Sequence, residues 1–203
     1  PTTTTTYTVT GTDVNGCINT DMITVNVNQL PTVVANANPA TICVGDPTTL
    51  TGSGASTYSW DNGVTNGITF NPTTTTTYTV TGTDVNGCVG SNQVVVTVNS
   101  IPAASLSGVQ DICIGNSATL NFNLIGNAPF TVDFTDGINN FISILDNNGN
   151  LLVGDAITFS PTSNTTYNIT SVSDVNACSN TASGSELIIV NPLPTAIISG
   201  ATT

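Results

Sequence analysis

The feature that most limits how this chain can fold is a segment that occurs twice, letter for letter. PTTTTTYTVTGTDVNGC occupies residues 1–17 and again residues 72–88, and a looser copy, one residue longer, occupies residues 161–178. A segment that recurs through one chain indicates a tandem array of similar structural units. We therefore divide the sequence into repeats before assigning any element.

Each copy has the pattern of one half-buried β-strand followed by a turn. In the second copy Tyr78, Val80 and Gly82 alternate with threonines. Alternation with period two, built from β-branched and aromatic residues, is typical of a strand with one buried face. The letters DVNG at 84–87 are a turn signal, and a cysteine follows them. The pattern predicts a strand over 76–83 and a hairpin turn after it.

Short proline-containing junctions recur at the same place after the last strand of each unit, as QLP, SIP and NPLP. They divide the chain into four parts. We assign 1–28 to the C-terminal strands of a truncated repeat, 29–99 to a complete repeat, 100–191 to a longer complete repeat, and 192–203 to the start of a further repeat. We interpret the chain as a piece of something much longer.

The first complete repeat shows several short strands separated by turn signals and no helical period. The expected strands are 33–36, 48–53, 57–60, 68–71, 76–83 and 93–99, and an earlier strand at 22–28 closes the truncated repeat. The second complete repeat has added length, which reads as one more hairpin over 141–145 and 150–153. Short strands at this spacing predict an all-β fold of antiparallel β-sandwiches.

The charge composition excludes several classes of function. The chain has 12 acidic residues and no Lys, Arg or His, which gives a formal net charge of −12. Without cations there is no patch for nucleic-acid phosphates, and without histidine there is no Ser-His-Asp triad or imidazole metal ligand. No apolar run is long enough to span a bilayer. We expect no enzyme activity, no nucleic-acid partner and no membrane insertion.

The five cysteines occupy recurring positions. Each complete repeat has one early and one late cysteine, so we pair Cys43 with Cys88 and Cys113 with Cys178. Cys17 is left over, and its partner is expected upstream of the fragment. The alternative is that all are reduced, buried thiols. Recurrent spacing in a composition of this extracellular type favours disulfides.

Aromatic residues in the strands are the expected core. Trp60 ends a strand, and the alternative for it is an exposed ring that stacks on a sugar. Phe130 and Phe134 are the counterparts of Tyr58 and Trp60 in the second complete repeat. The predicted core residues are Tyr58, Trp60, Tyr78, Val80, Phe130, Phe134 and Tyr167.

Most of the acidic residues lie in turns, beside Gly, Asn or Pro, where side-chain oxygens bond to nearby backbone amides. One loop also has the alternating oxygen ligands of a calcium site: Asp146, Asn148 and Asn150. It lacks the following Gly and the closing bidentate Glu of an EF-hand. Calcium at these three residues is the one metal we consider, and we expect no other cofactor.

These motifs together resemble a known family. The combination C-x-G-x-x-x-x-L-T, Y-S-W-x-x-G and P-T-x-T-T-T-Y-T-V-T-x-T-D-x-x-G-C is similar to the Ig-like (PKD-related) repeats of giant cell-surface adhesins of Bacteroidota, above all gliding-motility adhesins of the SprB type. The second complete repeat departs from the pattern, with Phe134 in place of Trp60 and Ala177 in place of Gly87. The residues that carry the resemblance are Cys43, Gly45, Leu50, Tyr58, Trp60, Gly63, Pro72, Tyr78, Asp84, Gly87 and Cys88.

The resemblance implies tandem Ig-like antiparallel β-sandwich repeats in an extended array. It implies structural stalk repeats of a long secreted adhesin filament at the cell surface, exported by type IX secretion and serving gliding motility and surface attachment. The implied partners are neighbouring repeats of the same chain, and gliding or secretion machinery contacted through regions outside this fragment. The alternative is an Ig-like module that binds a glycan or a protein within a secreted multidomain protein.

Overall fold

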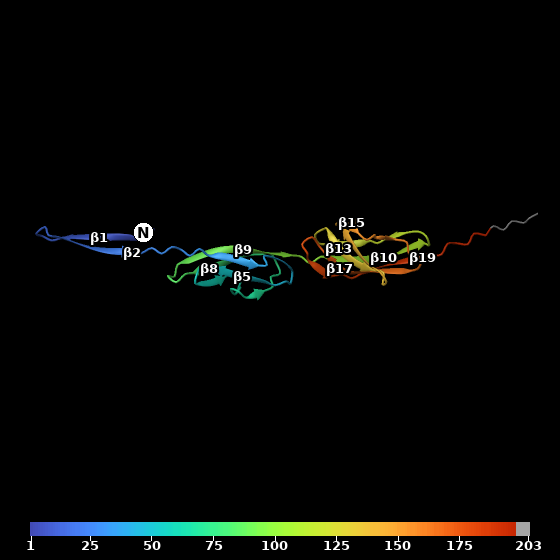
Figure 1. Ribbon diagram of the computed structural model, residues 1–203, viewed down its shortest axis with the longest axis horizontal. Coiled ribbons are helices and arrows are strands. Elements are labelled where there is room, and N and C mark those ends of the chain that lie inside the picture. Colours follow the sequence, from blue (N-terminus) through green and yellow to red (C-terminus); the bar gives the residue numbers. More distant parts are fainter. Residues whose placement is uncertain (198–203) are drawn as a thin grey trace, which may run out of the picture. The chain divides into compact units, whose positions relative to one another are not determined.

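The computed structural model describes residues 1–197, which form β-strands and connecting turns and contain no helix (Figure 1). The chain separates into two compact units, Pro1–Val98 and Asn99–Thr203. The first unit contains a two-stranded hairpin and a β-sandwich, and the second is a larger sandwich. Each is described by itself.

The hairpin at the start of the chain consists of β1 (Thr5–Thr12) and β2 (Ile18–Val25). The two strands pair antiparallel along their whole length. Our sequence prediction began the second strand at residue 22. It begins at Ile18 instead, because the pairing with β1 continues up to the turn. Among the described residues, these strands pair only with each other.

The sandwich of the first unit consists of two facing sheets. One sheet has the order β3-β5-β7 and the other β4-β9-β8-β6. The predicted strands at 48–53, 57–60 and 76–83 are confirmed, whereas the short strand β4 was missed because three residues carry no periodic signal. The strands are β3 (Val34–Asn38), β4 (Thr41–Cys43), β5 (Thr48–Ser53), β6 (Thr57–Trp60), β7 (Thr69–Phe70), β8 (Thr76–Thr83) and β9 (Val89–Asn99).

The core of this sandwich lies between its two sheets. Leu50, Val80 and Val96 are fully enclosed, and the rings of Phe70 and Tyr78 meet edge to face at 5.5 Å between centroids. Burying each such side chain stabilises the fold by about 1.5–3 kcal/mol. The alternating residues of the repeated segment therefore supply much of this core.

The second unit is built on the same plan with more strands. Its main sheet has the order β12-β10-β19-β17-β13-β14-β15, with β18 also paired to β17, and β11 pairs with β16. The strands are β10 (Ala103–Cys113), β11 (Ala118–Thr119), β12 (Phe122–Ile125), β13 (Phe130–Thr135), β14 (Asn140–Leu145), β15 (Leu151–Gly154), β16 (Thr158–Phe159), β17 (Thr165–Ser173), β18 (Ser179–Thr181) and β19 (Ser185–Asn191).

The hairpin expected in the second complete repeat is confirmed as β14 and β15, which pair antiparallel beyond β13. Its Phe141 extends the core. The Phe141 ring stacks on Phe134 at 5.1 Å and meets Phe159 at 5.1 Å, and Phe159 stacks on Tyr167 at 4.6 Å between centroids. A chain of aromatic rings thus takes the place that Trp60 and Tyr78 occupy in the first sandwich.

Both sandwiches are Ig-like. In the first, strands β3, β5 and β7 correspond to A, B and E of an immunoglobulin domain, and β6, β8 and β9 correspond to C, F and G. In the second, the first strand, β10, pairs antiparallel with β12 through residues 103–106 and parallel with β19 through residues 107–113. Residues 192–197 form no strand, and the rest of the expected further repeat, 198–203, lies outside the described residues.

Candidate functional site

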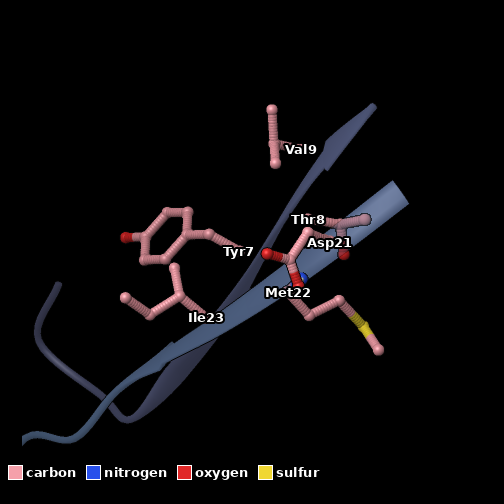
Figure 2. A pocket seen from close by; sticks show the side chains of 6 residues that line it. All are labelled: Tyr7, Thr8, Val9, Asp21, Met22 and Ile23. Carbon is pink, nitrogen blue, oxygen red and sulfur yellow. The ribbon is translucent and has the colours of Figure 1, made fainter. Parts of the chain in front are cut away.

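Strand β1 of the β1–β2 hairpin exposes a face that the same sequence buries in β8. The side chain of Tyr7 is 48% exposed and that of Val9 is 67% exposed, whereas their equivalents Tyr78 and Val80 are 5% and 0% exposed. Figure 2 shows Tyr7 and Ile23 side by side on this face. Since the amino acids are identical, the surroundings alone make the difference.

A hollow of about 320 Å³ lies against the hairpin (Figure 2). Its lining is mostly apolar, with one carboxylate contributed by Asp21. We call the side of the hairpin that carries Tyr7, Val9, Asp21 and Ile23 the open face. The residues that line the hollow are Tyr7, Thr8, Val9, Asp21, Met22 and Ile23.

The equivalent face of β8 and β9 is covered tightly. A Cβ atom added to Gly82 would lie 2.7 Å from Cγ2 of Val33 and 2.8 Å from Cβ of Ala55, which is too close for any side chain. A Cβ added to Gly11, the equivalent glycine of the hairpin, would meet nothing within 4 Å. The glycine in this repeated segment therefore allows another part of the chain to approach closely.

The candidate calcium residues form a hydrogen-bonded turn. One carboxylate oxygen of Asp146 accepts hydrogen bonds from the backbone amides of Asn148 and Asn150, at 2.8 and 2.9 Å. The other accepts one from the side-chain amide of Asn150 at 2.9 Å. The side-chain amide of Asn150, and next its backbone amide, hold the pKa of the Asp146 carboxyl below its ordinary value of 3.8. This is turn chemistry of the type expected for the other aspartates.

The same turn occurs four times in the described residues. An aspartate carboxylate accepts from the backbone amides two and four residues later, and the residue three positions later has a positive φ. Gly16, Gly87 and Gly149 have φ of 82°, 80° and 79°, and Ala177 has φ of 60°. The aspartates concerned are Asp13, Asp84, Asp146 and Asp174. Within residues 1–197, no group of three or more acidic, Cys or His residues converges on one point.

The predicted disulfide pairs within the complete repeats are wrong. Cys17, Cys88 and Cys113 carry free thiols. Free thiols at Cys88 and Cys113 exclude the pairs Cys43–Cys88 and Cys113–Cys178. Recurrent spacing was a misleading guide because it does not show at which end of a sandwich a cysteine lies.

In the first sandwich the early and late cysteines lie near opposite ends. Cys88 closes the turn before β9, whereas the backbone near Cys43 is bonded to the other end of β9, where Thr97 N donates to Ala40 O at 2.9 Å. Nine residues separate positions 88 and 97, and three separate 40 and 43. At about 3.3 Å per residue, the two cysteines are on the order of 20 Å or more apart. A disulfide needs Cα atoms within about 7 Å.

The second sandwich places its cysteines in the same way. Cys113 lies opposite Asn191, the last residue of β19. The other end of β19, Ser185, lies opposite Asn168 in β17, and β17 then continues away from it toward the turn that contains Cys178. The whole length of β19 therefore separates the two cysteines.

The predicted core residues lie inside the sandwiches, with one exception. Trp60 is buried, and its indole nitrogen donates a hydrogen bond to Oδ1 of Asn66 at 3.0 Å, so the ring has no free face for a sugar. Tyr58 is only half-buried, and its hydroxyl bonds to the backbone of Ala55. The buried ones are Trp60, Tyr78, Val80, Phe130, Phe134 and Tyr167.

Sequence analysis did not single out Glu186 as a buried group. Its carboxylate is fully enclosed and accepts hydrogen bonds from the backbone amide of Asn121 at 2.9 Å and from the side-chain amides of Asn121 and Gln110. Glu186 follows the alternation of β19, with its side chain on the buried face. The inward-facing charge was the signal that could have found it. Its partners are neutral, so it joins β10 and β19 without an ion pair.

In residues 1–197 no helix is long and apolar enough to cross a membrane. No protein family matches the chain, and no curated protein matches it in sequence.

Several solved structures resemble the chain in fold. Three immunoglobulin domains of titin match at 14% identity with a TM-score of 0.49, covering 75% of this chain and 62% of theirs. A Ca²⁺-stabilised adhesin that helps an Antarctic bacterium reach out and bind ice matches at 15% identity and a TM-score of 0.46, covering 96% of this chain and 58% of that one. A 1.5-MDa bacterial ice-binding adhesin matches at 13% identity and a TM-score of 0.42, covering 93% of this chain and 74% of that one. The chain thus spans about six tenths of the length of the first two.

Proposed function

We propose that this chain is a stretch of structural stalk repeats from a long secreted adhesin filament at the cell surface. The repeats hold an adhesive region away from the cell and carry no chemistry of their own. The proposed division is a truncated repeat at 1–28, complete repeats at 29–99 and 100–191, and the start of another at 192–203.

One observation carries the proposal: residues that recur between the repeats are buried in the core of each sandwich or close its turns. Tyr78 and Tyr167 occupy equivalent buried places in β8 and β17, and Val80 and Ile169 do the same two residues later. The recurrent aspartates close the hairpin turns that follow.

Two further features suit an extended array. The connection between β9 and β10 has only three residues, 100–102, and ends in a proline that fixes φ, so the chain has little slack there. The net charge of −12, with no cation to offset it, opposes collapse and aggregation of a long chain.

The proposal extends to an extracellular location and to export and gliding machinery as partners of the whole protein, through regions outside this chain. Antibodies raised against residues 29–191 test it on intact cells of the source organism. We expect immunogold label distributed along thin surface fibres. Label confined to the cell interior or to compact particles would overturn the proposal.

A glycan array tests the alternative, a ligand-binding module. Sugar rings stack on exposed aromatic side chains. Trp60 is buried, and among the described residues Tyr7 is the one aromatic side chain that is largely exposed, so we expect no glycan to bind the intact chain. Saturable binding that persists in a chain lacking residues 1–28 would instead favour a binding module in one of the sandwiches.

A further inference from the structure

The first and last strands of the second sandwich, β10 and β19, are bonded directly to each other. Ser107–Cys113 of β10 lie beside Ser185–Asn191 of β19, and the two strands run parallel. The backbone amide of Ile114 adds a hydrogen bond to the carbonyl of Asn191 at 2.9 Å. We call this pairing of seven residues on each strand the terminal ladder.

The direction of the terminal ladder decides how tension acts on it. Tension along the chain pulls β10 toward its N-terminal end and β19 toward its C-terminal end. Because the strands are parallel, the two pulls have opposite directions along one axis, and they load all the bonds of the ladder together in shear. Hydrogen bonds weaken steeply with displacement, so a ladder that is instead peeled from one end breaks one pair at a time.

Glu186 joins the terminal ladder to the strand segment that follows β10. It is the second residue of the ladder in β19 and lies opposite Gly108. Its enclosed carboxylate accepts hydrogen bonds from the backbone and side-chain amides of Asn121 and from the side-chain amide of Gln110. The Gln110 amide also donates to the carbonyl of Thr119 at 2.7 Å. Sliding of β19 along β10 would separate the buried carboxylate from these donors, which strongly opposes the movement.

The terminal strands of the first sandwich are joined less extensively. There the last strand, β9, meets the beginning of the sandwich only at β4, which has three residues. In both sandwiches the residues that come first pair antiparallel with the second long segment, over four positions in one case and five in the other. The two sandwiches therefore differ mainly in the ladder that connects first strand to last.

The first sandwich also lacks the buried carboxylate and its donors. CIGNSATL at 113–120 aligns with CVGDPTTL at 43–50, and ELIIVN at 186–191 aligns with VVVTVN at 94–99. All three polar positions differ together, and Glu186 is the only glutamate in the chain. The residues in the places of Gln110, Asn121 and Glu186 are Ala40, Thr51 and Val94.

We infer that the second sandwich is a reinforced, load-bearing repeat, in which the terminal ladder and Glu186 resist tension that the first sandwich does not withstand. Under rising load the first sandwich unfolds and lengthens the chain while the second stays folded. The inference deepens the proposed stalk function and rests on it.

Single-molecule pulling of the full chain from its two ends, in a reducing buffer, tests the order of unfolding. Release of β3 to β9 adds about 220 Å of contour and release of β10 to β19 about 300 Å, at roughly 3.4 Å per residue, so the step length identifies the sandwich. We expect the shorter step first in each trace and the longer step at higher force. The reverse order, or no preferred order, would overturn the inference.

A second pulling direction tests the terminal ladder without any change in the core. A handle inserted after Asn116, in the exposed turn that follows β10, is pulled against the C-terminus. Both points lie at the Cys113 and Asn191 end of the ladder, so the strands peel apart. We expect the second sandwich to unfold at a force at least about twofold lower than in end-to-end pulling. Equal forces in the two directions would show that the ladder does not bear the load.

The contribution of Glu186 is tested by giving the second sandwich the residues of the first. In the triple variant Gln110→Ala, Asn121→Thr and Glu186→Val, we expect the second sandwich to unfold at least about tenfold faster at a fixed tension. Denaturant unfolding should change less, because the buried polar groups leave together with their partners. An unchanged unfolding rate under tension would overturn the role of Glu186.

Asp111→Thr is the matched control. Asp111 lies in the same ladder but is exposed, and threonine is the residue at the equivalent place in the first sandwich. We expect its unfolding rate under tension to change by less than about twofold. An effect as large as that of the triple variant would contradict a specific role of the buried carboxylate. None of these results would alter the immunogold pattern that tests the proposed function.

Discussion

Asn66 joins the two sheets of the first sandwich through Trp60. Its side-chain oxygen accepts a hydrogen bond from the indole nitrogen of Trp60 in β6 at 3.0 Å and another from the backbone amide of Gly52 in β5 at 2.7 Å. β5 and β6 belong to different sheets. One amide side chain in a loop therefore satisfies donors on both sides of the core.

Replacing Asn66 by Leu should destabilise the first sandwich by about 1–3 kcal/mol, because the Trp60 and Gly52 donors lose their acceptor. Denaturant unfolding followed by Trp60 fluorescence measures it, since this is the only tryptophan in the chain. Asn86→Ala is the matched control: Asn86 is exposed in a turn and is expected to change stability by less than about 0.5 kcal/mol. Equal effects of the two substitutions would contradict the role of Asn66.

The turn before Cys178 should be improved by Ala177→Gly. Ala177 adopts a φ of 60°, where an L side chain costs roughly 1–2 kcal/mol, and glycine stands at this place in the equivalent turns. Part of that gain is lost because glycine also frees the unfolded chain. We expect a net stabilisation of about 0.5–1 kcal/mol in the second sandwich, measured by calorimetry. The reciprocal change Gly87→Ala should destabilise the first sandwich, and a gain there would refute the argument.

The cysteines should react according to their positions. In the folded chain without reductant we expect thiol reagents to label Cys17, Cys88 and Cys113. Peptide mapping under non-reducing conditions should show no peptide that joins Cys43 to Cys88 or Cys113 to Cys178. Recovery of either linked peptide from freshly folded protein would show that a sandwich can bring its two ends together, against the strand register.

The turns closed by Asp13, Asp136 and Asp146 should respond to acid below the ordinary pKa of aspartate. Hydrogen bonds to these exposed carboxylates lower each pKa from 3.8, chiefly bonds from the backbones of Cys17 and Asn139 and from the Asn150 side chain. A lowered folded pKa gives stability that is full above 3.8 and is lost as the pH falls through the folded value.

Carboxyl-carbon NMR titration measures these pKa values directly, and we expect all three below 3.8. Asp146→Asn keeps one acceptor oxygen and removes the titration, so the β14–β15 hairpin of that variant should show no change in amide protection over this acid range. A midpoint at or above 3.8 for Asp146 would show that the turn does not bind the carboxylate in solution.

Several elements followed from local sequence. The strands at 48–53, 57–60 and 76–83 were predicted at their observed bounds, because alternation and turn residues act within a few positions of each other. The added hairpin β14–β15 was found for the same reason. β4 was not, since three residues are too few for a pattern and its position depends on pairing with β9.

The candidate site could not be predicted in the same way. The disulfide pairs failed because spacing along the chain does not give the end of the sandwich that each cysteine reaches, which depends on strand direction. Asn66 and Glu186 were missed because their partners, Gly52 and Asn121, lie 14 and 65 residues away in the sequence. The exposed Asp146 turn was foreseen as a turn, because all of its bonds lie within five residues.

The two identical segments separate the contributions most clearly. By itself the sequence determined that each becomes a strand with one apolar face and a glycine-containing turn, because backbone sterics, side-chain alternation and Asx turns are local. Only the tertiary structure decided that Val80 is enclosed while Val9 is exposed. Burial requires an opposing sheet, and that sheet comes from residues tens of positions away in the chain, which the strand itself does not encode.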